Sequence, residues 1–236
     1  MLDVKDLHAF YGASHVVQGV SFSISKGEAV ALVGRNGVGK TSTLKSLMGM
    51  ETRTRGRVDF DGSSLMGMAS HVRASRGLGY VPEERAVFPQ MNVEENIRIG
   101  ALLHSASDGR GVLERAYALF PILRDRRNQM AGTLSGGQQK MLALARGIAL
   151  QPKLLLVDEP TEGLMPANVE LITHALLSAT ETGMTVLVVD SSFDLLKTLC
   201  ARMYAMDRGV LIGTYKPADF SSPDELAATM LGETRN

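Results

Sequence analysis

The length, composition and charge of this chain exclude several classes of protein. Its 236 residues, 44% hydrophobic and 21% charged, suit one large globular domain with a sizeable core. Lys plus Arg and Asp plus Glu both number 25, so no overall basic field indicates a nucleic acid or an acidic membrane surface as partner. With one cysteine, Cys200, no signal-peptide pattern and no membrane-spanning apolar stretch, we expect a protein of the reducing cytosol.

The N-terminal part predicts two kinds of strand. Residues 4–11, 20–24 and 57–60 are short, alternating and separated by turn residues, which is typical of antiparallel strands. Residues 29–33 are continuously apolar, as in a parallel strand that is covered on both faces. A helical period follows over residues 41–49.

A glycine-rich loop joins this buried strand to the helix. Residues 34–41 fit G-x-x-x-x-G-K-[ST] in its required setting between a strand and a helix. The glycines allow a tight turn and let backbone N–H groups point at phosphate oxygens, where the helix start adds positive potential. Lys40 can reach the β- and γ-phosphates, and the Thr41 hydroxyl can bind Mg²⁺. We predict an ATP site made by Gly34, Arg35, Asn36, Gly37, Val38, Gly39, Lys40, Thr41 and Ser42.

The segment 89–133 has a helical pattern and is typical of an insertion into an α/β core. We predict a helix over residues 93–103 with Asn92 as its N-cap. A loop is expected at residues 109–111, and a second helix over residues 112–124.

Two acids follow the apolar run of residues 154–157. Asp158 and Glu159 therefore end a predicted buried strand, where ligands bind in open α/β sheets. We predict that Asp158 holds Mg²⁺ through water and that Glu159 is the general base toward the attacking water. The apolar run 186–189 predicts a further strand of the same sheet.

Residues 134–138 read L-S-G-G-Q and precede a long helical run. Ser135 and the two glycines predict a helix N-terminus without bulky side chains, which is a second anion site in one chain. In its order of phosphate loop, helical insertion, L-S-G-G-Q and V-D-E-P, the chain resembles the ABC-type ATPases. The resemblance implies one α/β domain of the P-loop NTPase type, with a mixed or parallel sheet core and an N-terminal antiparallel sheet. The resemblance implies two parts of this domain. The nucleotide-binding core comprises residues 1–88 and 134–236, and the helical subdomain comprises residues 89–133.

The same resemblance implies that two such domains pair head to tail. Each ATP then lies between the phosphate loop of one domain and the L-S-G-G-Q segment of the other. The residues expected to contact the partner's ATP are Ser135, Gly136, Gly137 and Gln138. Tyr11 matches the aromatic residue that stacks on adenine in this family.

Other segments resemble the shorter ATPase subunit of branched-chain amino-acid importers, and also its relatives in urea and short-amide importers. They are residues 34–41, 80–85, 88–96, 162–166 and 230–232. In such importers two different ATPases drive two membrane permease subunits, and a separate binding protein delivers the solute. This implies a cytoplasmic subunit that lies at the inner face of the cell membrane through its permease partners and binds no nucleic acid.

Three positions depart from the wider family pattern. Glu83 stands where most ABC ATPases have a glutamine linked to Mg²⁺ and water, and an acid can still serve as an Mg²⁺ ligand. Met165 replaces a common aspartate in the loop after Glu159, which crosses the dimer interface. Ser191 occupies the place of the switch histidine, and a serine has no imidazolium form with which to stabilise charge on a γ-phosphate.

We therefore expect an ATP-hydrolysing subunit, with Mg²⁺ as cofactor, that energises an importer of branched-chain amino acids or related small polar solutes. Because of Ser191, the alternative is a subunit that binds ATP, hydrolyses it weakly or not at all, and completes a partner's active site. Two other classes are disfavoured. A soluble ABC ATPase of repair or translation usually has two ATPase domains or a long coiled coil, and neither appears in this sequence. A P-loop kinase has no role for the L-S-G-G-Q segment. The apolar residues expected to line the permease-docking groove are Val87, Phe88, Pro89 and Met91.

Overall fold

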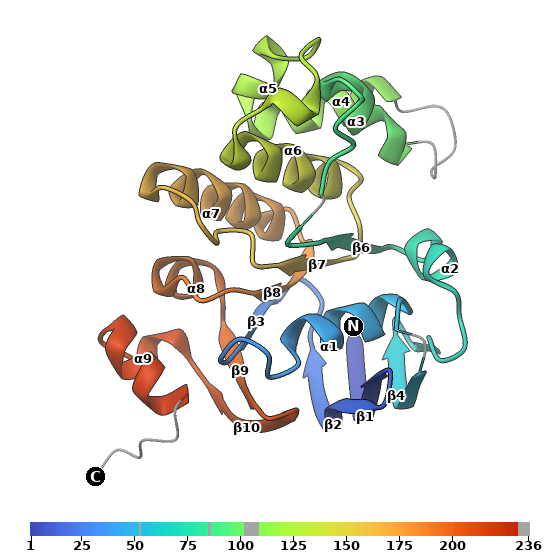
Figure 1. Ribbon diagram of the computed structural model, residues 1–236, viewed down its shortest axis with the longest axis vertical. Helices are drawn as coiled ribbons and strands as arrows, with labels where there is room; N and C mark the ends of the chain where they lie inside the picture. Colours follow the sequence, from blue (N-terminus) through green and yellow to red (C-terminus); the bar gives the residue numbers. More distant parts are fainter. Residues whose placement is uncertain (52, 85, 102–108, 231–236) are drawn as a thin grey trace.

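The computed structural model describes residues 1–51, 53–84, 86–101 and 109–230, and these residues form two sheets with helices around them (Figure 1). The first sheet is antiparallel, with the strand order β2-β1-β4-β5. Its strands are β1 (Leu2–Tyr11), β2 (Ser14–Ile24), β4 (Arg53–Phe60) and β5 (Ser63–Ser64). The three antiparallel strands expected from the alternating pattern are confirmed, each longer than the apolar pattern alone indicated.

The second sheet has the order β10-β9-β3-β8-β7-β6. Its strands are β3 (Ala29–Val33), β6 (Leu78–Val81), β7 (Leu154–Asp158), β8 (Thr185–Val189), β9 (Arg202–Asp207) and β10 (Val210–Tyr215). All neighbouring pairs are parallel except β9 with β10, so the sheet is mixed. The α/β class, with a mixed sheet and a separate antiparallel one, is therefore confirmed.

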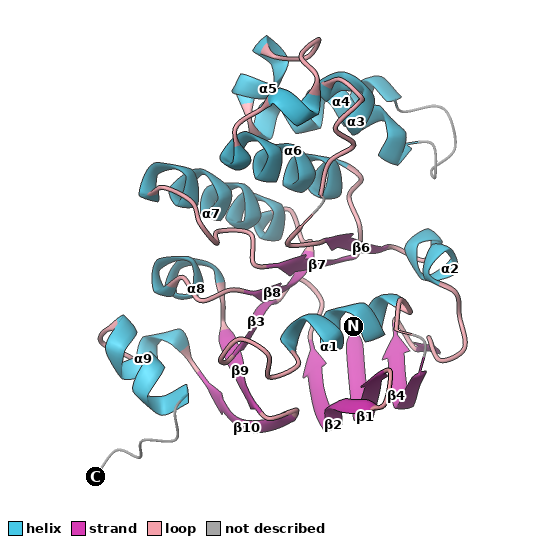
Figure 2. Cartoon of the chain, in the orientation of Figure 1, coloured by secondary structure: helices cyan, strands magenta, loops and turns pink. Residues whose placement is uncertain are grey.

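The central strands are continuously apolar because both faces of this sheet are buried. In β3, Ala29, Ala31 and Val33 face a core shared with the large helices. Val30 and Leu32 face a second core, shared with the antiparallel sheet and with α1 (Lys40–Met48). Figure 2 shows α1 between the two sheets. With neither face in water, alternation of polar and apolar residues disappears, as the sequence indicated.

The helical insertion packs on α6 (Gly136–Ala149) and differs in detail from the prediction. Its helices are α3 (Val93–Ala101), α4 (Gly109–Leu119) and α5 (Pro121–Asp125). Asn92 does cap α3, since its Oδ1 accepts from the Glu95 N–H and the Glu95 carboxylate accepts from the Asn92 N–H, both at 2.8 Å. The predicted end of this helix, residues 102–103, lies outside the described residues.

Two expectations in this insertion were wrong. Residues 109–111 are the first residues of α4 and not a loop. Even in a helix interior a glycine costs only about 1 kcal/mol relative to alanine, and packing of the apolar face of α4 outweighs that. The second predicted helix is split in two, since Pro121 has no N–H to continue α4 and instead starts α5.

The remaining helices complete the layers on the two sides of the mixed sheet. They are α2 (Ser70–Ser75), α7 (Pro166–Glu181), α8 (Phe193–Leu199) and α9 (Pro223–Met230), with short 3₁₀ turns at Ala131–Thr133 and Pro217–Asp219. Cys200 is buried, as expected of a small core residue, and burial raises the pKa of its thiol to about 12. None of the helices in the described part of the chain combines the length and apolar character needed to cross a membrane.

Candidate functional site

The phosphate loop runs from the end of β3 to the start of α1. Its first and last glycines have φ angles of 152° and 111°. A side chain at Gly34 would collide with the Met206 carbonyl, and one at Gly39 would lie 2.8 Å from the Val16 carbonyl oxygen. No side chain caps α1, so its first N–H groups are left for a ligand. The loop geometry therefore needs the glycines that the motif supplies, and it opens onto a helix start suited to an anion.

Lys40 lies folded across this loop. Its Nζ donates to the carbonyl oxygens of Gly34 and Arg35, at 2.8 and 3.1 Å. The same nitrogen is 3.7 Å from Glu159 Oε1, and the Lys40 side chain is only 7% exposed. The structure thus brings the predicted phosphate-binding cation and the predicted general base to one point.

Asp158 lies beside the loop and is held by two hydroxyl groups. Thr41 Oγ1 donates to Asp158 Oδ1 at 3.1 Å, and the Tyr80 hydroxyl donates to Oδ2 at 3.2 Å. Burial raises the pKa of Asp158, while these two hydrogen bonds and the charges of Lys45 and Lys40 oppose the rise. Thr41 and Asp158 give adjacent hard oxygen donors, the type that Mg²⁺ prefers.

Three carboxylates gather at the same site. Oxygen atoms of Glu83, Glu159 and Glu162 all lie within 4.8 Å of one another. Burial, a hydrogen bond with Glu162 and the charge of Glu159 raise the pKa of Glu83 to about 7. Burial also raises the pKa of Glu159, and the nearby Lys40 opposes this rise. A bound cation would relieve this repulsion, so the donor set fits Mg²⁺ at the edge of the phosphate loop.

Lys40, Thr41 and the three glutamates line one cavity of about 350 Å³, whereas Asp158 lies behind Thr41 and does not line it. Its lining includes Asn36, Gly37, Gly39, Lys40, Thr41, Ser42, Glu83, Glu159 and Glu162. Glu162 was missed in the sequence analysis. Its position three residues after Glu159, in the same turn, was the available signal.

Tyr11 stands apart from that cavity. It is the last residue of β1 and is 74% exposed, with Gly12 making the turn into β2. On the adjacent strand, Val16 does line the cavity. Tyr11 is therefore free to pack against a flat group at the cavity rim, and its role toward adenine stays a prediction.

The L-S-G-G-Q segment begins α6. Ser135 is its N-cap: its Oγ accepts from the Gln138 N–H at 3.3 Å, and the Gln138 side chain accepts from the Ser135 N–H at 3.1 Å. Ser135 and Gly136 are exposed, Gly137 is buried, and none of the four signature residues lines the cavity around Lys40. The signature residues therefore do not face the cavity of their own chain, and their contact with a partner's ATP stays a prediction.

Ser191 follows β8 and lies next to the phosphate loop. It lines a cavity of about 390 Å³ together with Gly34, Arg35 and Asn36 on one side and α9 on the other. The preceding Asp190 is buried and accepts hydrogen bonds from the Thr161 N–H, the Thr161 hydroxyl and the Ser192 N–H, at 3.0, 2.7 and 2.7 Å. These bonds fix the turn that carries Ser191 relative to the loop after Glu159.

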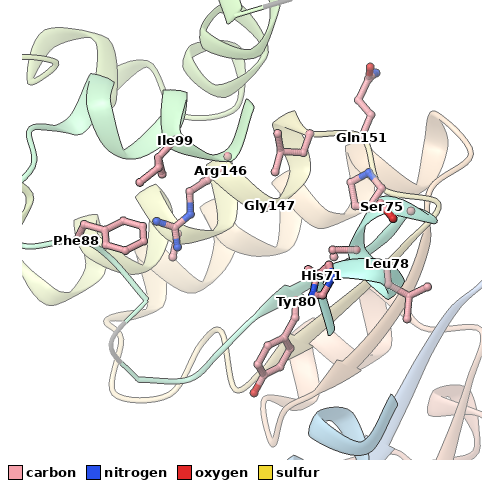
Figure 3. A pocket seen from close by; sticks show the side chains of 16 residues that line it. His71, Ser75, Leu78, Tyr80, Phe88, Ile99, Arg146, Gly147 and Gln151 are labelled. Atoms are coloured by element: carbon pink, nitrogen blue, oxygen red, sulfur yellow. The ribbon is translucent and has the colours of Figure 1, made fainter. Parts of the chain in front are cut away.

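A separate cavity of about 450 Å³ lies where β6, α2, α3 and α6 meet. Of the four apolar residues predicted for a docking groove, Phe88 lines this one and the other three do not. Figure 3 shows the Arg146 guanidinium reaching toward the Phe88 ring, and its carbon lies 5.2 Å from the ring centroid. Tyr80, which bonds Asp158, also lines the cavity, so one side chain joins this groove to the phosphate site.

Comparison with known proteins identifies the family. Residues 17–162 match the family model described as ABC transporter. The chain belongs to the ABC transporter family. As an ATP-binding transporter subunit, it is an ABC-type ATPase, which is the class that the L-S-G-G-Q and V-D-E-P motifs predicted.

Relatives within the family serve different transporters. The chain is 34% identical over 212 residues to the high-affinity branched-chain amino acid transport ATP-binding protein BraG of Pseudomonas aeruginosa, covering 90% of this chain and 91% of BraG. It is 30% identical over 234 residues to the lipopolysaccharide export system ATP-binding protein LptB of Escherichia coli, covering 98% and 97%. A dimeric ATP-binding cassette solved with ADP and phosphate superimposes with a TM-score of 0.83 at 23% identity, over 92% of this chain and 99% of the other.

Proposed function

We propose that this ABC ATPase energises a membrane importer, for branched-chain amino acids or related small polar solutes. The observation that carries the hydrolytic part is the pair of Lys40 Nζ and Glu159 Oε1, 3.7 Å apart across a cavity built on the phosphate loop. In that pair, a phosphate-binding cation and a carboxylate with a raised pKa face the same small cavity. The same loop carries every glycine that phosphate binding needs.

In this proposal each group has a definite task. Lys40 and the N–H groups at the start of α1 bind the phosphates, and Tyr11 stacks on adenine. Thr41, Asp158 and Glu83 hold Mg²⁺, which supplies positive charge toward the phosphate oxygens when bound. Glu159 accepts a proton from the attacking water, for which a raised pKa makes it a better base.

A second cassette supplies what the cavity lacks. The signature residues lie outside their own chain's cavity with an exposed helix start, which supports a head-to-tail dimer in which Ser135, Gly136, Gly137 and Gln138 contact the partner's ATP. Met165 is 70% exposed in the loop after Glu159, as expected of an interface residue.

The groove around Phe88 is our candidate for the permease contact. Its lining is mostly apolar, Phe88 is 45% exposed, and Tyr80 connects the groove with Asp158. An apolar cytoplasmic segment of a permease seated there would place the chain at the inner face of the cell membrane. A substrate-binding protein would then act through the permeases.

Mutation of Glu159 tests the hydrolytic part. We expect Glu159→Gln to lower ATP turnover by 100-fold or more, on the order of one lost general base, while ATP still binds. ATP binding is followed by calorimetry, and turnover by phosphate release from the assembled transporter with the partner cassette's own catalytic site inactivated. Unchanged turnover would remove Glu159 from the mechanism.

Ser191 supports the second candidate, a cassette that binds ATP and hydrolyses it slowly. A serine at this place gives the phosphate loop no imidazolium. The comparison is between Glu159→Gln here and the matching change in the partner cassette. If the partner change has little effect while Glu159→Gln alone abolishes turnover, the slow-site candidate is wrong.

Uptake measurements test the transport class. In cells that lack this chain, uptake of radiolabelled leucine should fall and return with the gene. The similarity to LptB makes lipopolysaccharide export the competing assignment. Intact leucine uptake together with loss of surface lipopolysaccharide would favour it.

A further inference from the structure

Lys140 binds the loop that carries the proposed general base. Lys140 lies in the second turn of α6, after the L-S-G-G-Q segment. Its Nζ donates to the carbonyl oxygen of Glu159 at 2.9 Å and to that of Glu162 at 2.8 Å. Both acceptors are backbone atoms, so the bonds constrain the path of the chain at Glu159 and leave its carboxylate free.

Glu159 needs such constraints because its backbone is in an unfavourable region. Its φ angle is 43°, in the left-handed region that residues with a Cβ seldom adopt. Such a conformation persists when neighbouring groups over-determine it, and it is frequent at functional sites. The Glu159 N–H donates to the Val189 carbonyl at 2.7 Å, and Lys140 holds the carbonyl on its other side. The strand β8 and the helix α6 thus fix both peptide groups of Glu159.

The helix that carries Lys140 is itself firmly placed beside this loop. A Cβ at Gly137 would lie 2.6 Å from Asn168 Nδ2 at the start of α7, so the two helices approach closely where α6 begins. The capping box of Ser135 and Gln138 fixes the first turn of α6. Hydrogen bonds from an ammonium group are shorter and stronger than neutral ones, so Lys140 is a stiff link between α6 and the loop.

We propose that Lys140 is a positioning residue for Glu159, an inference that rests on the proposed role of Glu159 as general base. The Lys140 ammonium sets the position of the Glu159 carboxylate relative to Lys40 and the attacking water. A misplacement of about 1 Å at a catalytic group can lower turnover by about 100-fold. Through these bonds, α6, which begins at the L-S-G-G-Q segment, also sets the position of Glu159 in the same chain.

Substitution at Lys140 tests this role in the assembled transporter with its partner's own catalytic site inactivated. Lys140→Met keeps the length of the side chain and removes the donor, and we expect kcat to fall by about tenfold or more. The KM for Mg-ATP should stay close to wild type, because Lys140 does not line the phosphate cavity. The melting temperature should fall modestly, because two backbone carbonyl groups lose their donor. Lys140→Arg keeps a cationic donor and should restore most of the activity. If Lys140→Met fails to fold, Lys140→Gln, with one amide donor, takes its place in the same measurements.

The control is Lys197→Met, which removes an exposed lysine from α8 and should leave kcat unchanged. Faster amide hydrogen exchange at residues 159–164 in Lys140→Met, but not in the control, is also expected. An unchanged kcat in Lys140→Met, or a loss that Lys140→Arg does not relieve and that comes with a lower melting temperature, would overturn the proposal. Glu159→Gln separates the two levels: if it leaves turnover intact, the proposed function fails, and if it abolishes turnover while Lys140→Met does not, only the role of Lys140 fails.

Discussion

The hydrogen bond from Tyr80 to Asp158 gives a prediction whose size follows from burial. Asp158 is only 1% exposed, and the Tyr80 hydroxyl donates to its Oδ2 at 3.2 Å. Tyr80→Phe removes this donor from a buried carboxylate, which costs about 1–3 kcal/mol. For a chain of this length each kcal/mol lowers the melting temperature by about 2–4 °C, so we expect a decrease of about 2–12 °C without nucleotide.

The effect of Tyr80→Phe should depend on pH in a definite direction. Burial already raises the folded-state pKa of Asp158 above its ordinary value of 3.8, and loss of the hydroxyl raises it further. A raised folded-state pKa leaves stability intact below the unfolded pKa and removes it as pH rises through the folded one. The melting difference between variant and wild type should therefore be larger at pH 8 than near pH 4, as measured by thermal unfolding in EDTA.

Tyr117 offers a matched control for this change. Its hydroxyl is buried and has no hydrogen-bond partner among the described residues. Tyr117→Phe removes an unpaired polar atom and should leave the melting temperature unchanged or slightly higher. Equal melting of Tyr80→Phe and wild type, or an equal decrease in both variants, would refute the reasoning about Asp158.

Three further predictions concern the same region. Ser191→His should raise the rate of phosphate release by about tenfold or more with ATP affinity unchanged, whereas Ser191→Asn, which cannot carry a charge, should not. The folded-state pKa of Glu83 is raised to about 7 from its ordinary 4.5, so the contribution of Glu83 to stability is lost as pH rises from about 4.5 through 7. Glu83→Gln should therefore flatten that part of the pH profile of the unfolding free energy, as measured by urea unfolding without nucleotide or metal. Gly137→Ala puts a Cβ 2.6 Å from Asn168 Nδ2 and should reduce turnover in the partner's site, which a mixed dimer with one altered chain can measure.

The parts of the fold that could be predicted from sequence are those with a local physical cause. The central strands were recognisable because a sheet buried on both faces needs apolar residues at every position, as in β3, β7 and β8. Asn92 and Ser135 were recognisable as N-caps because a short polar side chain can satisfy the free N–H groups of the turn that follows. The loop predicted at residues 109–111 was wrong, because glycines are as acceptable at a helix start as in a loop.

The contacts that organise the site are of a different kind. Lys140 and Glu159 are joined by a bond from a side chain to a backbone oxygen, and Tyr80 reaches Asp158 from a different strand. No periodicity or motif encodes such a pairing, because it depends on how α6 and β6 pack against the loop after β7. The sequence likewise did not identify Glu162 as a site residue. Its carboxylate belongs to the site because it lies close to those of Glu83 and Glu159.

The arrangement also explains why the motifs define a family more readily than a transported substrate. Lys40, Thr41 and Glu159, which we propose to act on the chain's own ATP, line one cavity, and the relatives BraG and LptB, which serve different cargoes, share this chain's overall sequence at 34% and 30% identity. In the proposed function, cargo acts on this chain through a permease segment in the groove around Phe88. Tyr80 is the described side chain that lines that groove and also bonds a proposed Mg²⁺ ligand. If permease binding stimulates ATP turnover, Tyr80→Phe should reduce that stimulation more than it reduces basal turnover, because the groove and the phosphate site would lose a direct hydrogen-bonded connection while Lys40 and Glu159 keep their places. Equal reduction of both rates would mean that Tyr80 serves Asp158 alone and that the permease signal takes another route.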